Sequence, residues 1–382
     1  MVMRCLFALL GAIGAFTLLP RAWCGLQADA WYDGDPALTH AYAEDLVAFE
    51  AGDTAARAAG TNRYAGEWAL VTHQMVALGL AQLVMAHPEW KAELAPVVRT
   101  AALRSFGPEM RDFGTRAWGE DALDPAVLAG SHGHAYLAYA AMAVGMSLLV
   151  DDDPLPADVR TTYDALIAAY IRRLDASTTG LIETYPGEAF PTDVAAVAAA
   201  IAIHGRVTHD WHRATLDRWG DAVRSVQIDP VSGLVYQRLD AVTGTPHDSP
   251  RASGTGLAAY FAGFADRTVA RDLTAGLLRQ ERQFDGFGGI REYPGDVAGS
   301  GDVDSGPVLL GISVSATGFA LAPCRAYGHR ASFNRLYRTT DLFGMPVAES
   351  AGSVDTFRFR TGGPIGNALL LAFLTSGPEV AP

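Results

Sequence analysis

Two kinds of predicted helix alternate along this chain. In residues 159–174 the apolar positions recur every three or four residues, which predicts a helix with one buried face. Residues 194–203 and 369–374 are instead apolar on every side, and such helices are buried all round. The alternation indicates an outer layer of amphipathic helices that covers an inner layer of buried ones.

Each kind of helix is predicted six times. The amphipathic helices are expected to start near Pro36, Glu89, Pro156, Asp210, Asp266 and Ser332. The buried helices are expected to start near Glu67, His132, Asp193, Arg251, Ser305 and Pro364. Six such hairpins close an all-α (α/α)6 barrel, a double-ring toroid. An open solenoid is the alternative, but it would expose apolar inner helices on its concave face.

Three segments repeat one local pattern at intervals of about 55 residues, which indicates a repeat architecture. They begin at Gly180, Gly233 and Gly289 and end at an aspartate, as the third segment does at Asp304. The pattern predicts a glycine turn, a short extended piece and a helix that the aspartate caps. Because the repeat continues without a linker, residues 28–382 are expected to form one domain.

The N-terminal segment is apolar. Arg4 precedes a run from Cys5 to Leu19 that carries no charge. Fifteen apolar residues fit the core of a signal peptide better than a membrane span, which needs about 20. Residues 1–25 are therefore predicted to be a signal peptide or membrane anchor, with a buried N-terminal helix as the alternative. The body would then be secreted, periplasmic or anchored to the cytoplasmic membrane facing outward.

Charge and cysteine content narrow the classes of function. The 382 residues carry a formal net charge of −13, which argues against nucleic-acid binding, since that depends on Lys and Arg contacts to phosphate. Cys324 is the one cysteine of the body, so a disulfide or a cysteine-based zinc site is excluded there. It is interpreted as a buried apolar residue.

In an (α/α)6 barrel the loops that enter the inner helices meet at one mouth, where acid–base groups would gather. Two carboxyls with different pKa values can protonate a leaving oxygen and accept a proton. The candidate catalytic residues are Glu183, Asp193, Asp304, Glu292, Glu67 and His134. The candidate substrate-binding residues, mostly aromatic, are Tyr64, Trp68, Trp118, Tyr185, Arg251 and Tyr293.

Structural roles compete with these assignments. Asp193, Asp248 and Asp304 also fit as helix caps, and Arg251 fits as an ion-pair partner of Asp248. His132 and His134 could bind metal in an extended segment, but side chains two apart at a helix start diverge by about 200°. Neither a metal nor an organic cofactor is expected.

Residues 180–193, Gly-Leu-Ile-Glu-Thr-Tyr-Pro-Gly-Glu-Ala-Phe-Pro-Thr-Asp, resemble a cavity loop of the linalool dehydratase/isomerase family. The resemblance extends loosely over residues 60–376 and implies an (α/α)6 barrel similar to six-hairpin glycosidases. His134, after Gly133, resembles the family's cavity histidine. The family's chemistry uses two cysteines in this loop, and they match Thr184 and Asp193. The resemblance thus implies the cavity but not the cysteine chemistry.

Three functions fit the sequence. The first is a cofactor-independent enzyme that cleaves or forms a C–O bond by carboxylate acid–base catalysis, either as a hydratase or lyase on an alcohol or as a glycoside hydrolase. The second is a non-catalytic envelope protein that binds a glycan or lipid in the cavity. The third is a structural role, with the mouth plugged by its own loops.

Overall fold

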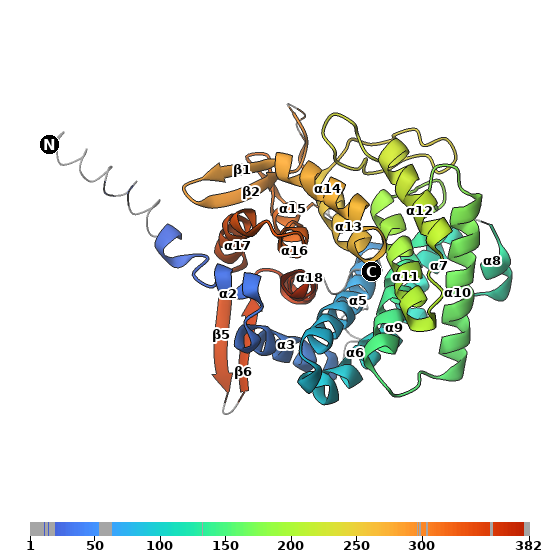
Figure 1. The fold of residues 1–382 in the computed structure, drawn as a ribbon, viewed down its shortest axis with the longest axis horizontal. Helices are drawn as coiled ribbons and strands as arrows, with labels where there is room; N and C mark the ends of the chain where they lie inside the picture. The colour runs from blue at the N-terminus through green and yellow to red at the C-terminus, as the bar shows by residue number, and fades with distance from the viewer. Residues whose placement is uncertain are drawn as a thin grey trace.

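The computed structural model describes residues 20–52, 63–131, 133–295, 299–302, 305–351 and 354–377, with positions 11, 14 and 297. Helices dominate this part of the chain, as the all-α class predicts (Figure 1). The buried helices are α5 (Arg63–Ala86), α9 (Ala138–Val150), α11 (Pro191–Thr208), α13 (Ala252–Ala265), α15 (Val314–Phe319) with α16 (Leu321–Ala326), and α18 (Gly363–Thr375). The amphipathic helices are α3 (Pro36–Ala51), α6 (Lys91–Ser105), α10 (Ala157–Ala176), α12 (Arg213–Ala222), α14 (Arg267–Arg279) and α17 (Arg330–Gly344).

The buried helices contact one another in a closed cycle. Helix α5 packs against α9, α9 against α11, and α11 against α13. The cycle continues from α13 to α15 and α18, and α18 returns to α5. Small side chains allow this close packing, because the interior positions of α11 are mostly alanine and almost all of them are buried. The apolar composition of these helices therefore reflects neighbours on every side.

Amphipathic helices cover this inner layer. Helix α6 packs on α5 and α9, α10 on α11, α14 on α13, and α17 on α15 and α16. The predicted starts of most helices are close to those observed. The fifth buried helix is the exception: the prediction near Ser305 is wrong, since residues 308–313 form a hairpin and the helix begins at Val314.

Three short helices and several 3-10 or π turns connect these elements. They are α2 (Ala28–Asp33), α7 (Pro108–Trp118), α8 (Pro125–Ala129), two 3-10 turns (Pro88–Trp90 and Ala135–Leu137) and a π turn (Val223–Gln227).

Two small antiparallel sheets were not predicted. The first has the order β1-β2-β4-β3, and the second pairs β5 with β6. Their bounds are β1 (Glu281–Phe284), β2 (Phe287–Arg291), β3 (Val308–Leu309), β4 (Ile312–Ser313), β5 (Pro346–Ala351) and β6 (Val354–Phe359). Strands this short leave little alternation to detect. The turn between β1 and β2 was the available signal, because Asp285-Gly286 favours a two-residue hairpin and both residues have positive φ.

Helix α5 explains a second apolar segment. Residues Tyr64–Ala86 are long and apolar enough to cross a membrane, but 78% of the most apolar window is buried inside the molecule. Its composition is therefore accounted for by its place in the inner layer.

Two glycines bring α14 against the loop before α13. A Cβ placed on Gly276 would lie 2.0 Å from the backbone oxygen of Gly233, and no flexible side chain can yield there. Gly263 in α13 has more space, since the nearest atom to its Cβ would be the Tyr327 hydroxyl at 3.5 Å.

We expect Gly276→Ala to lower the free energy of unfolding by about 1–3 kcal/mol, because the backbones must separate. Gly263→Ala is the matched control and should raise that free energy by up to about 1 kcal/mol through its better helix propensity. Urea unfolding measures both. Equal effects of the two substitutions would contradict the close contact.

Candidate functional site

A cavity of about 650 Å³ lies at the N-terminal ends of α5, α11, α13 and α18. Helices α15 and α17 and both hairpins of the larger sheet complete its wall. Most lining side chains are aliphatic or aromatic, among them Phe190, Leu257, Phe287, Phe319, Leu369 and Phe373. The described loops therefore leave the cavity open, and its walls suit an apolar molecule.

Asp193 is a buried carboxyl in this wall. Pro191 starts α11, as proline often does at a first helical position, so Asp193 falls in the first turn and not at the cap. Its Oδ1 accepts a hydrogen bond from the Tyr139 hydroxyl at 2.6 Å, and its Oδ2 accepts one from Thr184 Oγ1 at 2.7 Å. Burial raises the pKa of Asp193, and these two hydrogen bonds oppose the rise only in part. The site thus favours a carboxylic acid in a largely apolar cavity.

Other polar side chains, most of them threonine and serine, also line the cavity. Glu67 is the second carboxyl of the described lining. Gln237 lies beside Gly254, and its buried Oε1 accepts no hydrogen bond from the described residues. Thr192 Oγ1 donates to the Gly254 carbonyl at 3.0 Å.

The structure brings together five of the predicted site residues. Tyr64, Glu67, Trp68, Tyr185 and Asp193 all line the cavity. Six others do not line it: Glu183, Glu292, His134, Trp118, Arg251 and Tyr293. Asp304, like His132, lies outside the described residues.

An aromatic layer supports the wall behind Tyr185. The Tyr185 ring stacks on Tyr136, with ring centroids 6.2 Å apart and planes 5° apart. His134 is fully buried, packs on Trp118 and places Nε2 3.1 Å from Glu120 Oε1. His134 is thus one layer away from the cavity lining.

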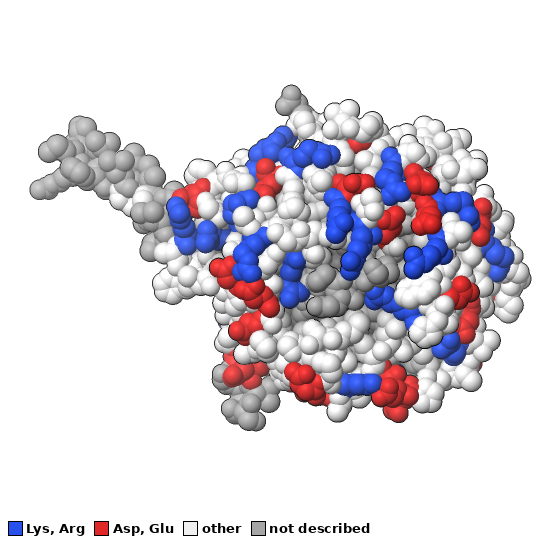
Figure 2. Space-filling view, viewed as in Figure 1, with Lys and Arg blue, Asp and Glu red and all other residues white. Residues whose placement is uncertain are grey.

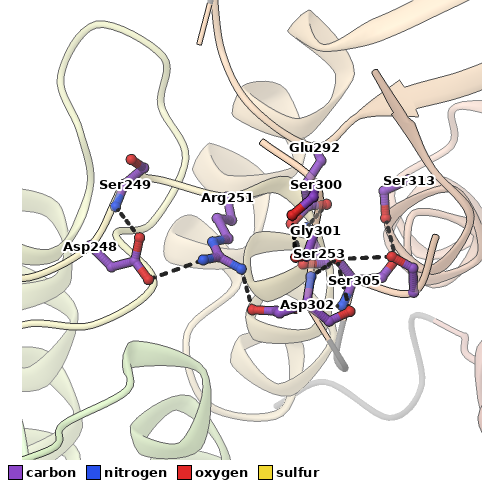
Figure 3. A network of polar contacts seen from close by, with 11 residues as sticks. Asp248, Ser249, Arg251, Ser253, Glu292, Ser300, Gly301, Asp302, Ser305 and Ser313 are labelled. Atoms are coloured by element: carbon purple, nitrogen blue, oxygen red, sulfur yellow. Dashed lines mark hydrogen bonds and ion pairs between the residues drawn. The ribbon is translucent and has the colours of Figure 1, made fainter. Parts of the chain in front are cut away.

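Glu292 holds the start of α13. Its Oε1 accepts from Ser253 Oγ at 2.6 Å, and its Oε2 accepts from the Ser253 N–H at 3.2 Å (Figure 3). Burial raises the pKa of Glu292, and the hydrogen bonds from Ser253 oppose the rise. Since Ser253 lines the cavity, the carboxyl of Glu292 lies one hydrogen bond behind the wall.

Arg251 is an ion-pair residue. It pairs with Asp248, with 3.0 Å between Nη2 and Oδ2, and its other amino group pairs with Asp302 (Figure 3). Its guanidinium also lies 5.5 Å from the centre of the Tyr293 ring. The predicted pair with Asp248 is therefore confirmed.

The predicted caps are wrong where the structure describes them. Asp193 is inside α11, and no side chain caps that helix. Asp248 lies three residues before Arg251, the N-cap of α13, and it bonds to Ser249 N–H and Arg251 instead. Glu183 accepts a hydrogen bond from the Gly187 N–H at 3.2 Å and thereby supports its own turn.

Sequence reasoning missed Tyr139, Gln237 and Ser253. Tyr139 lies in the apolar helix α9, where a tyrosine fits a core position equally well. Gln237 lies within the second repeat segment and Ser253 just after it, and the neighbouring Asp248 and Arg251 were the more conspicuous residues. A polar residue near the start of an otherwise apolar inner helix was the available signal for Tyr139 and Ser253.

Metal-ligating groups cluster away from the lining. Within the described ranges, one group of three could hold a metal ion, formed by His40, Glu44 and Glu93. None of these residues lines the cavity. Cys324 is fully buried, as predicted, and burial raises the pKa of its thiol.

No family model matches the chain, and no curated protein is significantly similar to it in sequence.

The raised pKa of Asp193 makes a prediction about stability and pH. The folded state favours the neutral carboxyl of Asp193. The contribution of this carboxyl to the free energy of unfolding is therefore complete below a pH of about 4 and is lost as pH rises through the folded-state pKa. We expect Asp193→Asn, which stays neutral, to become progressively more stable than the parent as pH rises from about 4 to 8.

Asp121 provides a control of opposite sign. Two hydrogen bonds of 2.8 Å from Arg111 lower the pKa of Asp121, so its contribution is present above a pH of about 4 and is lost as pH falls. Asp121→Asn should thus lower the free energy of unfolding at neutral pH. In acid the substitution should have little effect on that free energy. Urea unfolding across this range measures both variants, and parallel pH profiles would contradict the assignment.

Proposed function

We propose that the protein is a cofactor-independent enzyme that cleaves or forms the C–O bond of an apolar alcohol, with Asp193 as the acid–base group. The buried Asp193 carboxyl in an apolar cavity is the observation that carries this proposal. The reaction class is dehydration of an alcohol to an alkene, or the reverse hydration.

The architecture that we propose around this site is an (α/α)6 barrel. The closed cycle of contacts among the buried helices and the amphipathic helices outside it support this arrangement. In such a barrel the N-terminal ends of the inner helices surround one mouth, and the cavity lies at four of these ends.

The resemblance to the linalool dehydratase/isomerase family is part of the same proposal. The two loop positions that match the family's cysteines are Thr184 and Asp193, and their side chains are hydrogen-bonded here. Positions nine residues apart in sequence thus meet at one point of the wall. A threonine–aspartate pair would replace thiol chemistry with carboxyl chemistry at that point.

The acid–base steps balance with the groups present. The neutral Asp193 carboxyl donates its proton to the hydroxyl of the substrate, the C–O bond breaks and water leaves. Glu67 then accepts a proton from the adjacent carbon, and that electron pair forms the C=C bond. Transfer of a proton back to Asp193 through solvent restores both carboxyls. Tyr185 and Trp68 present aromatic faces that stabilise positive charge on carbon.

The apolar wall favours this reaction over glycoside hydrolysis. A sugar carries a hydroxyl on most carbons, and each would need a hydrogen-bonding partner inside the cavity. In the described lining, aliphatic and aromatic side chains outnumber the polar ones. The same wall supports a second candidate, a non-catalytic protein that carries a lipid or another apolar molecule.

The catalytic proposal predicts the effect of removing one acid. With terpene and long-chain alcohols as substrates and alkene formation followed by gas chromatography, Asp193→Asn should lower kcat by about 10²–10⁴-fold. The variant cannot donate the proton, although it should fold at least as well as the parent at neutral pH. Glu183→Gln, in the same loop but outside the cavity lining, is the matched control and should keep most activity. Loss of activity in the control and not in Asp193→Asn would contradict the proposal.

The carrier candidate predicts a different pair of results. An apolar ligand present at about 100 times its dissociation constant should stabilise the fold by about 2.7 kcal/mol, visible as a rise in Tm. A carrier would show this rise with no turnover of any alcohol, and Asp193→Asn would retain the ligand affinity. Stabilisation by oligosaccharides alone would contradict both candidates.

A further inference from the structure

The mouth of the cavity is surrounded by exposed apolar side chains. Six residues both line the cavity and are exposed: Tyr64, Trp68, Phe284, Leu309, Leu310 and Phe343. They come from α5, β1, the β3–β4 hairpin and α17, so segments far apart in sequence contribute to one rim. Exposed apolar patches of this kind mark interaction surfaces.

The backbone at Leu310 holds an apolar side chain outward. Leu310 has a φ of 53° in the turn between β3 and β4, a left-handed conformation that asparagine, aspartate or glycine adopts more readily. Its side chain is fully exposed. The left-handed backbone at this leucine costs conformational energy, and its side chain is not buried by the described residues. This combination points to a contact with another molecule.

The described residues that follow the N-terminal apolar run lie beside this rim. Arg21 pairs with Asp285 at 2.8 Å, and Asp285 directly follows the rim residue Phe284. Arg338 donates to the carbonyls of Cys24 and Gly286 at 3.1 and 2.9 Å, which ties the same segment to α17 and the β1–β2 turn. Figure 1 shows the chain near residue 20 next to these elements. Residue 20 therefore lies near the rim, and the apolar residues 5–19 precede it in sequence.

Positive charge accompanies the rim. Arg282 is exposed, lines the mouth and donates only to the backbone carbonyls of Arg279 and Glu281 among the described residues. Figure 2 shows Lys and Arg side chains over β1, β2 and α17 with Asp and Glu side chains among them, and further Lys and Arg side chains across the rest of this face. Arg282 thus presents a positive charge at the mouth, although the molecule as a whole carries a net charge of −13.

We infer that the rim is a membrane-docking surface, which places the cavity mouth against a lipid bilayer that contains anionic head groups. The apolar side chains would enter the interface, Arg282 would meet lipid phosphate, and residues 5–19 would enter the same bilayer. Apolar molecules dissolved in the membrane could then pass into the cavity without crossing water. The docking itself does not depend on the proposed function.

The test uses the full chain in vesicles of phosphatidylcholine and phosphatidylglycerol. In a Cys5→Ser, Cys24→Ser background, an environment-sensitive fluorophore is attached at Leu310→Cys on the rim or at Val242→Cys, an exposed apolar position outside the cavity lining. Lipids with a quencher on the acyl chain should quench the Leu310 label several-fold more than the Val242 label. Because the quencher is on the acyl chain, quenching requires the Leu310 label to enter the bilayer, whereas a tether through residues 5–19 would only hold it near the surface.

Three outcomes would overturn the inference. Equal quenching of both labels would mean that the mouth does not face the bilayer. Shielding of the Leu310 label that depends on protein concentration and not on vesicles would assign the rim to a second copy of the chain. If the Leu310 label is quenched as strongly in vesicles of pure phosphatidylcholine as in the mixed vesicles, and if Arg282→Gln does not reduce its quenching, anionic head groups have no part in the docking.

Discussion

The hydrogen-bonded group of Tyr139, Asp193 and Thr184 fixes the geometry on which the rest of the cavity depends. It joins the inner helices α9 and α11 to the loop that precedes α11, and it does so through one buried carboxyl. Ionising this carboxyl in an apolar wall is unfavourable, so the same burial that organises the wall also raises the pKa of Asp193. Burial of the Asp193 carboxyl therefore accounts both for the geometry of the wall and for the proposed acid–base role.

Periodicity was sufficient to predict the helices, because the two kinds of burial leave different patterns in sequence. Residues 194–203 are apolar all round since α11 has neighbours on every side, and residues 159–174 show one stripe since α10 has one covered face. The hairpins escaped prediction because two-residue strands such as Val308–Leu309 carry almost no pattern. The start of α15 was misplaced for the same reason.

The candidate site was predicted in part, and the errors have a common cause. Asp193, Glu67 and Tyr185 were placed at the cavity by their position at the ends of inner helices. Glu292 and Arg251 occupy similar sequence positions, but their side chains turn toward Ser253 and toward Asp248 and Asp302. Sequence position specifies the end of a helix, whereas the direction of a side chain depends on partners from other segments.

The contact between α5 and α18 has a consequence for how the chain folds. Gln82 donates to the Ala372 carbonyl at 2.8 Å and to Thr375 Oγ1 at 2.9 Å, across 290 and 293 residues of sequence. The inner cycle therefore cannot close until the last helix has been synthesised, and contacts of such long range form slowly. Until then α5 has an uncovered apolar face, which leaves the unfinished chain prone to aggregation.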